Sequence, residues 1–265
     1  MIPAPGLYVH VPFCVRRCPY CDFYSISALD LIPKYVSSLA LEAQTAAANW
    51  KQPFETLYIG GGSPSLLNAE GLKGLFKALE PLDLSRLKEI TLEANPEDVI
   101  EGQAELWAEM GVTRLSLGLQ TLDERWLGDV LGRQHTLEQS YQAVERLKGR
   151  PYDLSFDLMY GLPAQKQEHW GEDLLKAAEL EPDHISTYSL TVEPGTPLAK
   201  SIAEKFLPAP PPQEMVAEML LISGQALSGK GFYRYEVSNF AKPGHESLHN
   251  LKYWRRQSYL GLGPS

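Results

Sequence analysis

The sequence of 265 residues has few cysteines, no excess of basic charge and no long apolar run, and each shortage excludes a class of protein. Its three cysteines, Cys14, Cys18 and Cys21, are too few and too clustered for a disulfide framework. The 33 acidic side chains outnumber the 24 basic ones, and this net charge of −9 argues against extended nucleic-acid binding. No stretch approaches about 18 uninterrupted apolar residues, so we expect no transmembrane segment.

The N-terminus also lacks the features of a secretory signal. Residues Met1–Gly6 include no basic side chain, and no apolar core of the usual length follows them. A clustered cysteine set without such a signal predicts a cytoplasmic protein, in which thiols stay reduced and serve metal or redox chemistry.

Short strand-like runs alternate with longer helical patterns along the chain. Strands are predicted at 7–11, 55–59, 88–93, 113–119, 152–158 and 184–190. Helices are predicted at 32–49, 69–80, 101–110, 123–131, 137–148, 168–180 and 213–229. Six β/α units in a row predict an α/β fold, a partial (β/α)6 TIM-like barrel with parallel strands inside and helices outside. A complete barrel would need eight units.

Two regions are expected along the chain. Residues 1–231 are predicted to form the barrel core, which includes a stiff proline-rich connection, Pro208–Pro212, before the last predicted helix. Residues 232–265 are predicted to be a C-terminal extension made of one added strand and a final segment.

The cysteines form a C-x3-C-x2-C pattern directly after the first predicted strand. Three thiolates on one loop can hold a four-iron cluster and leave one iron open to an external ligand. The alternative is zinc, because His10 lies four residues before Cys14 and Cys3His zinc sites exist. Zinc spacings usually come as two separated pairs, which favours the cluster.

Polar residues lie at the ends of several predicted strands. Gly60–Pro64 follows the second strand, and glycines let the backbone approach a ligand closely. Glu93, Gln120, Asp157 and Thr191 close or follow later strands. Each alone could be a turn, a helix cap or a partner for buried backbone. Because the carboxyl ends of parallel strands share one face, the set predicts a binding site there.

A third pattern is His249-Asn250-Leu251-Lys252-Tyr253-Trp254 near the C-terminus. His249 has the chemistry of an axial heme ligand, Tyr253 that of an alternative ligand, and Trp254 offers a stacking surface. Histidine with aromatic residues is also a common packing group, so the segment could instead pack on the barrel.

At its cysteine loop the chain resembles the radical S-adenosylmethionine (SAM) superfamily, whose signature has an aromatic residue before the last cysteine, here Tyr20. From Leu7 onward it is similar to the oxygen-independent coproporphyrinogen III oxidase-like proteins, through LYVHVPFC, GGGSPS, LGLQT and DLMYGLP. The oxidase proper has a fourth cysteine where this chain has Phe23. Phe at that position, together with H-N-x-x-Y-W, is typical of the heme chaperone branch.

The resemblance implies a [4Fe-4S] cluster on Cys14, Cys18 and Cys21 and a SAM site built from residues at matching positions. Arg133 is the expected partner of the SAM carboxylate, since a guanidinium fork fits a carboxylate bidentately. The implied SAM site consists of Tyr8, the backbone at Tyr20, Gly61, Gly62, Ser63, Glu93, Gln120, Arg133, Asp157 and Thr191.

The function implied by the resemblance is that of a heme chaperone that passes heme to acceptor hemoproteins, with a homodimer as a possible assembly. The alternative is the oxidase or another radical SAM enzyme of porphyrin metabolism. Phe23 argues against oxidase activity because its ring cannot ligate iron, although whether the protein is an enzyme stays open. A zinc-stabilised binding protein is a third interpretation. The family continues into a C-terminal helical domain, so we expect this sequence to be a truncated form.

Overall fold

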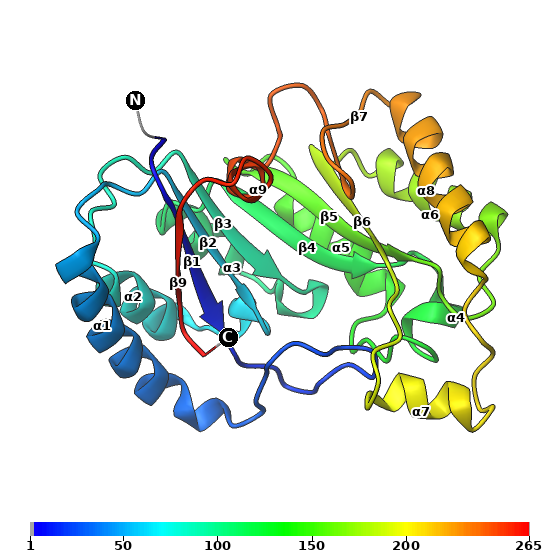
Figure 1. Cartoon of the computed structure of the whole chain (residues 1–265), viewed down its shortest axis with the longest axis horizontal. Helices are drawn as coiled ribbons and strands as arrows, with labels where there is room; N and C mark the ends of the chain where they lie inside the picture. The colour runs from blue at the N-terminus through cyan, green and yellow to red at the C-terminus, as the bar shows by residue number, and fades with distance from the viewer. Residues whose placement is uncertain (1–2, 265) are drawn as a thin grey trace.

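The computed structural model describes residues 3–264, which form one curved sheet with the longer helices around its outside (Figure 1). All six predicted strands are confirmed to within two residues at each end. They are β1 (Gly6–Val11), β2 (Thr56–Gly61), β3 (Glu89–Ala94), β4 (Arg114–Gln120), β5 (Asp153–Tyr160) and β6 (His184–Ser189). They pair in chain order and all run parallel, so their carboxyl ends meet at one end of the sheet.

The helices cover the sheet and start where local chemistry favours them. The Asn68 side chain caps the first turn of α2, and Thr136 and Gln139 form a reciprocal capping box at the start of α5. The predicted helices that are present at nearly full length are α1 (Ile32–Asn49), α2 (Ala69–Ala78), α3 (Gln103–Glu109), α5 (Leu137–Leu147), α6 (Gln167–Glu179) and α8 (Gln213–Ser228).

The helix predicted at 123–131 is wrong in length, because α4 ends early (Glu124–Leu127). The chain turns after it, and Gly132 adopts a left-handed backbone with φ of +58°. A Cβ at Gly132 would lie 2.7 Å from Cδ of Pro19, so the turn presses against the cysteine loop. The helical hydrogen bonds thus give way after Leu127 to a turn that ends at the left-handed Gly132.

Several short elements were not predicted. Thr196 caps α7 (Pro197–Ala203) and Ser247 caps α9 (Leu248–Trp254). Single 3-10 turns lie at η1 (Leu29–Leu31), η2 (Pro64–Leu66) and η3 (Pro96–Asp98). Elements this short bury little apolar surface of their own, so they leave a weak periodic signal in the sequence.

The C-terminal segment contributes three strands, where the sequence predicted one. β8 (Asn239–Ala241) pairs antiparallel with β6, β7 (Tyr233–Arg234) pairs antiparallel with β8, and β9 (Tyr259–Leu262) pairs parallel with β1. Over residues 3–264 the order is β7-β8-β6-β5-β4-β3-β2-β1-β9, with β7 and β9 as the two edges. The barrel is therefore open, as predicted for six parallel units.

Between β8 and β9 the chain crosses the amino ends of the parallel strands, where α9 lies (Figure 1). Buried charges hold it there. The Glu89 carboxylate accepts hydrogen bonds from the backbone N–H groups of Leu248 and His249, and Arg114 pairs with Glu89 at 3.3 Å. The Arg114 guanidinium also donates to the carbonyl oxygen of His245 at 2.6 Å.

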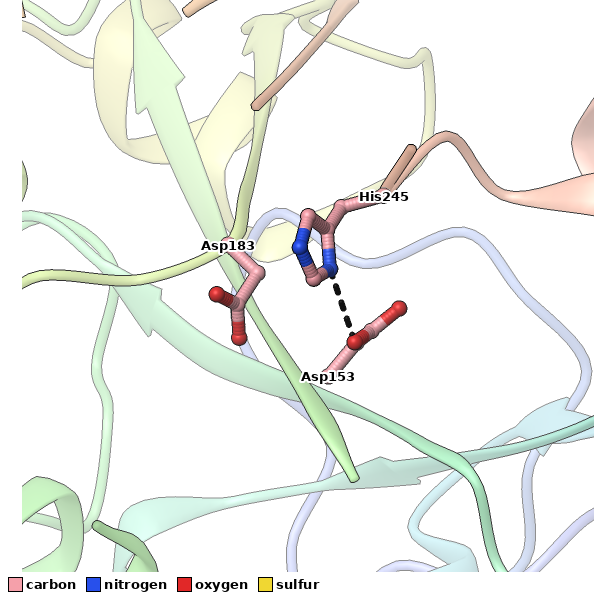
Figure 2. Close-up of side chains that lie close together, drawn as sticks. All are labelled: Asp153, Asp183 and His245. Atoms are coloured by element: carbon pink, nitrogen blue, oxygen red, sulfur yellow. Dashed lines mark hydrogen bonds and ion pairs between the residues drawn. The ribbon is translucent and has the colours of Figure 1, made fainter. Parts of the chain in front are cut away.

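Figure 2 shows three residues of metal-ligand type at this same end of the sheet. Asp153, Asp183 and His245 each place one ligand atom within 4.8 Å of the other two. Asp153 already bonds His245 Nδ1 at 2.8 Å and pairs with Arg114 at 3.2 Å. Asp183 accepts from the backbone N–H of Leu154. These bonds attach the C-terminal segment to β5. They explain the grouping of Asp153, Asp183 and His245 by a structural role.

Candidate functional site

The cysteine loop leaves β1 and folds back on itself before α1. Its base is closed by two backbone hydrogen bonds, from Cys14 N–H to the Ile26 carbonyl at 3.0 Å and from Ile26 N–H to the Pro12 carbonyl at 2.7 Å. The loop lies beyond the carboxyl ends of the strands (Figure 1). Cys14, Cys18 and Cys21 are free thiols, and all three are partly exposed.

A cavity of about 590 Å³ opens between this loop and the strand ends. The three cysteines line it together with nine of the ten residues expected at the SAM site. Those nine are Tyr20, Gly61, Gly62, Ser63, Glu93, Gln120, Arg133, Asp157 and Thr191. The tertiary structure thus brings residues from distant parts of the sequence together around one cavity.

Tyr8 is the expected SAM-site residue that is not among those lining the cavity. It lies within β1, and its hydroxyl bonds to Nδ1 of His10 at 3.2 Å. Its ring lies beside that of Tyr58, with the ring centres 6.0 Å apart. Tyr8 thus packs against Tyr58, which lines the cavity, and its contact with SAM stays a prediction.

The glycine-rich turn brings backbone close to the cysteine loop and supplies a hydrogen-bond donor. A Cβ at Gly62 would lie 2.6 Å from the carbonyl oxygen of Phe13. Gly61 has φ of +113°, which favours glycine, and its N–H donates to Glu93 at 3.0 Å. These contacts explain the glycines by the close packing of the turn against the cysteine loop, and a ligand contact by the turn stays a prediction.

Two partly buried carboxylates, Glu93 and Asp157, line the cavity. Burial, with a smaller contribution from the Asp157 charge, raises the pKa of Glu93 to about 7, although hydrogen bonds from Tyr58 and Gly61 act to lower it. Burial also raises the pKa of Asp157 to about 6, although the Ser116 hydroxyl bonds to it at 2.9 Å. Carboxylates with raised pKa values in a cavity are typical of ligand-binding and catalytic sites.

Gln120 enters the cavity through an irregularity in the sheet. The register between β4 and β5 shifts between Leu117 and Gln120, and Gln120 has φ of +66°, which is rare outside glycine. Such strain persists where the surrounding structure fixes it, often at functional sites. The sequence placed Gln120 at a strand end but carried no signal for the bulge that re-aims it.

Arg133 and Ser63 reach the cysteine sulfurs. Arg133 Nη1 donates to Cys18 Sγ at 3.6 Å, and Ser63 Oγ donates to Cys14 Sγ at 3.8 Å. Sequence reasoning missed Asn95, which bonds to both Arg133 and Ser63. Its position at the end of β3, two residues after Glu93, was the one available signal.

His10 is turned away from the three thiols. It is buried, and its Nε2 bonds to the Tyr24 carbonyl at 3.0 Å while its Nδ1 bonds to the Tyr8 hydroxyl. Both ring nitrogens are thus engaged outside the cavity. This arrangement argues against His10 as a fourth ligand and leaves a set of three thiols, which fits an iron–sulfur cluster with one iron open to an external ligand.

The His249–Trp254 segment lies at the opposite end of the sheet, in α9. His249 is 1% exposed, and its ring bonds to Thr56 at 2.8 Å and to the Tyr253 hydroxyl at 3.0 Å. Burial lowers the pKa of His249 to about 4. Tyr253 and Trp254 are 40% and 55% exposed, so the segment buries its histidine and presents its aromatic rings at the surface.

Residues 8–177 match the model of the Radical SAM superfamily. That range includes the cysteine loop, most of β1 and all of the strands β2 to β5. The chain therefore belongs to the radical SAM superfamily.

Relatives within that superfamily narrow the assignment to its HemW branch. The chain is 39% identical to the heme chaperone HemW of Bacillus subtilis over 97% of its own length and 68% of that protein. It is also 39% identical to radical S-adenosyl methionine domain-containing protein 1, mitochondrial, of Bos taurus, over 99% of its length and 61% of that protein. The chain thus spans about two thirds of the length of these relatives.

Among solved structures, the chain is similar to coproporphyrinogen III oxidase (HemN) from Escherichia coli, described as a radical SAM enzyme. The TM-score is 0.84 at 25% sequence identity, over 99% of this chain and 64% of the oxidase. The partial barrel is therefore shared with an enzyme of that class.

Within residues 3–264, no helix is both long and apolar enough to cross a membrane.

Proposed function

We propose that the protein is a heme chaperone of the HemW type, which binds heme and passes it to acceptor hemoproteins. The observation that carries this is the 39% identity to HemW of Bacillus subtilis over nearly the whole chain. A reducing cytoplasm is the compartment that suits free clustered thiols. A homodimer is our proposal for its assembly, to be tested by its mass in solution.

The superfamily implies a [4Fe-4S] cluster and SAM, and the cavity residues fit both. Cys14, Cys18 and Cys21 would hold the cluster, which supplies one-electron chemistry and an open iron when bound. Glu93, Gln120, Asp157 and the Gly61–Ser63 backbone would hold SAM, with the cavity wide enough for a ligand of that size. Tyr8 would support the SAM site through its packing against Tyr58, which lines the cavity.

Heme is proposed to bind at the His249–Trp254 segment, with the exposed Tyr253 and Trp254 rings as its first contacts. His249 can serve as an axial ligand only if one ring nitrogen gives up its bond, either that of Nδ1 to Thr56 or that of Nε2 to Tyr253. Because burial lowers its pKa to about 4, the imidazole in the closed arrangement is neutral at pH 7, and the neutral form is the one that binds iron. Ligation would therefore require local opening of α9.

The alternative function is that of an oxygen-independent coproporphyrinogen III oxidase, favoured by the structural similarity to HemN. Phe23 argues against it. The Phe23 ring lines the cavity and is 70% exposed, where the oxidase pattern has a cysteine. An apolar ring offers neither a thiol for iron nor a proton donor.

One experiment separates these functions. The protein is reconstituted anaerobically, and heme binding and coproporphyrinogen III turnover are measured on the same sample with SAM and reductant present. We expect a Soret band from bound heme, altered in Trp254→Ala, and no turnover. Phe23→Cys is expected to remain without turnover. Robust conversion of coproporphyrinogen III by the wild-type protein would replace the chaperone with the oxidase.

A further inference from the structure

Two of the three cysteine sulfurs accept hydrogen bonds from side chains of other strand-end loops. Ser63, in the turn after β2, donates to Cys14, and Arg133, in the turn after α4, donates to Cys18. Cys21 lies apart from these two bonds; its backbone instead bonds to Cys18. The polar contacts are therefore concentrated on one side of the cysteine triangle.

Asn95 connects the two donors. Its Nδ2 donates to Ser63 Oγ at 2.9 Å, and its Oδ1 accepts from Arg133 Nη2 at 2.5 Å. A hydroxyl has a single proton, so by accepting from Asn95 the Ser63 hydroxyl keeps that proton for the sulfur of Cys14. The four contacts form a continuous chain between the two sulfurs, which we call the thiol belt: Cys14, Ser63, Asn95, Arg133 and Cys18.

The surroundings fix Asn95 in this orientation. Its backbone N–H donates to Ser65 Oγ at 3.2 Å, and Pro96 follows it at the start of η3. Arg133 depends on Asn95 in turn. Among the described residues, its buried Nε finds no partner, so its guanidinium is held through the two Nη groups. A side-chain amide can accept from Arg133 through its oxygen and donate to Ser63 through its nitrogen at once.

We propose that Asn95 is a positioning residue that sets the reduction potential of the cluster through the thiol belt. Hydrogen bonds to cluster sulfurs stabilise the reduced state and raise the potential, and partners that orient such donors share this effect. The proposal rests on the cluster of the proposed function. It gives Arg133 a role at the cysteines beside the SAM contact expected from the sequence.

The test is a redox titration of the reconstituted protein without SAM, followed by electron paramagnetic resonance. Asn95→Leu keeps the volume and removes both bonds. We expect the ratio of reduced to oxidised cluster at a fixed potential to fall about tenfold, equal to ~59 mV for a one-electron couple. In Ser63→Ala this ratio is expected to fall by less than in Asn95→Leu. In Ser63→Thr, which retains the hydroxyl, the ratio is expected to match that of the wild type.

A double variant tests whether Asn95 acts through Ser63. If it does, Ser63→Ala adds less to Asn95→Leu than it costs alone, because both changes remove the same bond to Cys14. Gln134→Leu is the matched control, since Gln134 lines the same cavity but lies outside the thiol belt. Its potential should equal that of the wild type.

Iron content separates failure of this inference from failure of the proposed function. If the wild type and Asn95→Leu both hold about four irons per chain and have equal potentials, the inference is overturned and the proposed function stands. If the wild type assembles no cluster, the proposed function fails, and the inference with it. Should Asn95→Leu alone lose iron, an unchanged potential in Ser63→Ala overturns the inference.

Discussion

The two ends of the parallel strands both bury charged side chains but use them differently. At the amino ends, Arg114 pairs with Glu89 and Asp153, and Lys252 pairs with Glu55 at 2.6 Å. At the carboxyl ends, Glu93 and Asp157 face hydroxyl groups and a backbone N–H beside a cavity.

The difference separates structural charge from charge kept for a ligand. A buried charge that is paired contributes to a fixed arrangement, and removal of one partner is costly. Where a carboxylate loses water and has no paired cation, its pKa rises. Such a carboxylate keeps hydrogen-bonding capacity for an incoming ligand. The ion pairs at the amino ends of the strands thus hold the C-terminal segment in place, and the carboxylates at the carboxyl ends stay available to bind a ligand.

The largest effect is expected at the cysteines. Cys18→Ser removes one of three thiols and leaves two, which cannot hold the cluster, so iron after reconstitution should fall from about four per chain to near zero. The measurement is iron and sulfide content with the visible spectrum. One bound zinc and no cluster in the wild-type protein would contradict the assignment.

At the amino end, Glu89→Gln should cost about 3 kcal/mol of the free energy of unfolding, because the buried Arg114 loses one of its two carboxylate partners and two backbone N–H groups lose a charged acceptor. Urea unfolding of the purified protein measures this. Glu145→Gln is the control, since Glu145 forms an exposed pair with Lys148 worth under about 1 kcal/mol. Equal stability of the two variants would show that the amino-end charges are not structural.

At the carboxyl end, Asp157→Ala should weaken SAM binding by about 1.5–3 kcal/mol, as for lost hydrogen bonds to a charged group. Asp153→Ala is the matched control, because it changes the same residue type at the other end of the same strand. Calorimetry on the cluster-loaded protein should show normal SAM affinity for Asp153→Ala. Unchanged affinity in Asp157→Ala would reject the pocket assigned to SAM.

The smallest effect is a pH dependence of stability from Glu93. Its folded pKa of about 7 lies above the ordinary value of 4.5, so the folded state binds the proton more tightly than the unfolded chain. The resulting stabilisation is complete below about pH 4.5 and is lost as pH rises through 7. Urea unfolding at pH 5 and pH 8 should differ by on the order of 2 kcal/mol more in the wild type than in Glu93→Gln. Identical pH profiles would contradict the raised pKa.

The sequence by itself determined the barrel and the composition of its carboxyl-end site. Short runs rich in aliphatic residues, such as those at β1 and β4, alternate with helical patterns and predict parallel strands, and parallel strands bring their carboxyl ends together whatever the details of packing. Glu93, Gln120 and Asp157 could therefore be assigned to one face before any coordinates were known.

Tertiary structure alone decided what surrounds those residues. In the sequence Asn95 is an ordinary strand-end residue, and its role depends on contacts with Ser63 and Arg133 from other loops. The bulge at Gln120 is defined by the pairing of β4 with β5. The place of His249 under the amino ends likewise depends on Glu89, 160 residues away in the chain. Local patterns record burial and periodicity, whereas these contacts join residues far apart in sequence, and only the folded chain brings them within bonding distance.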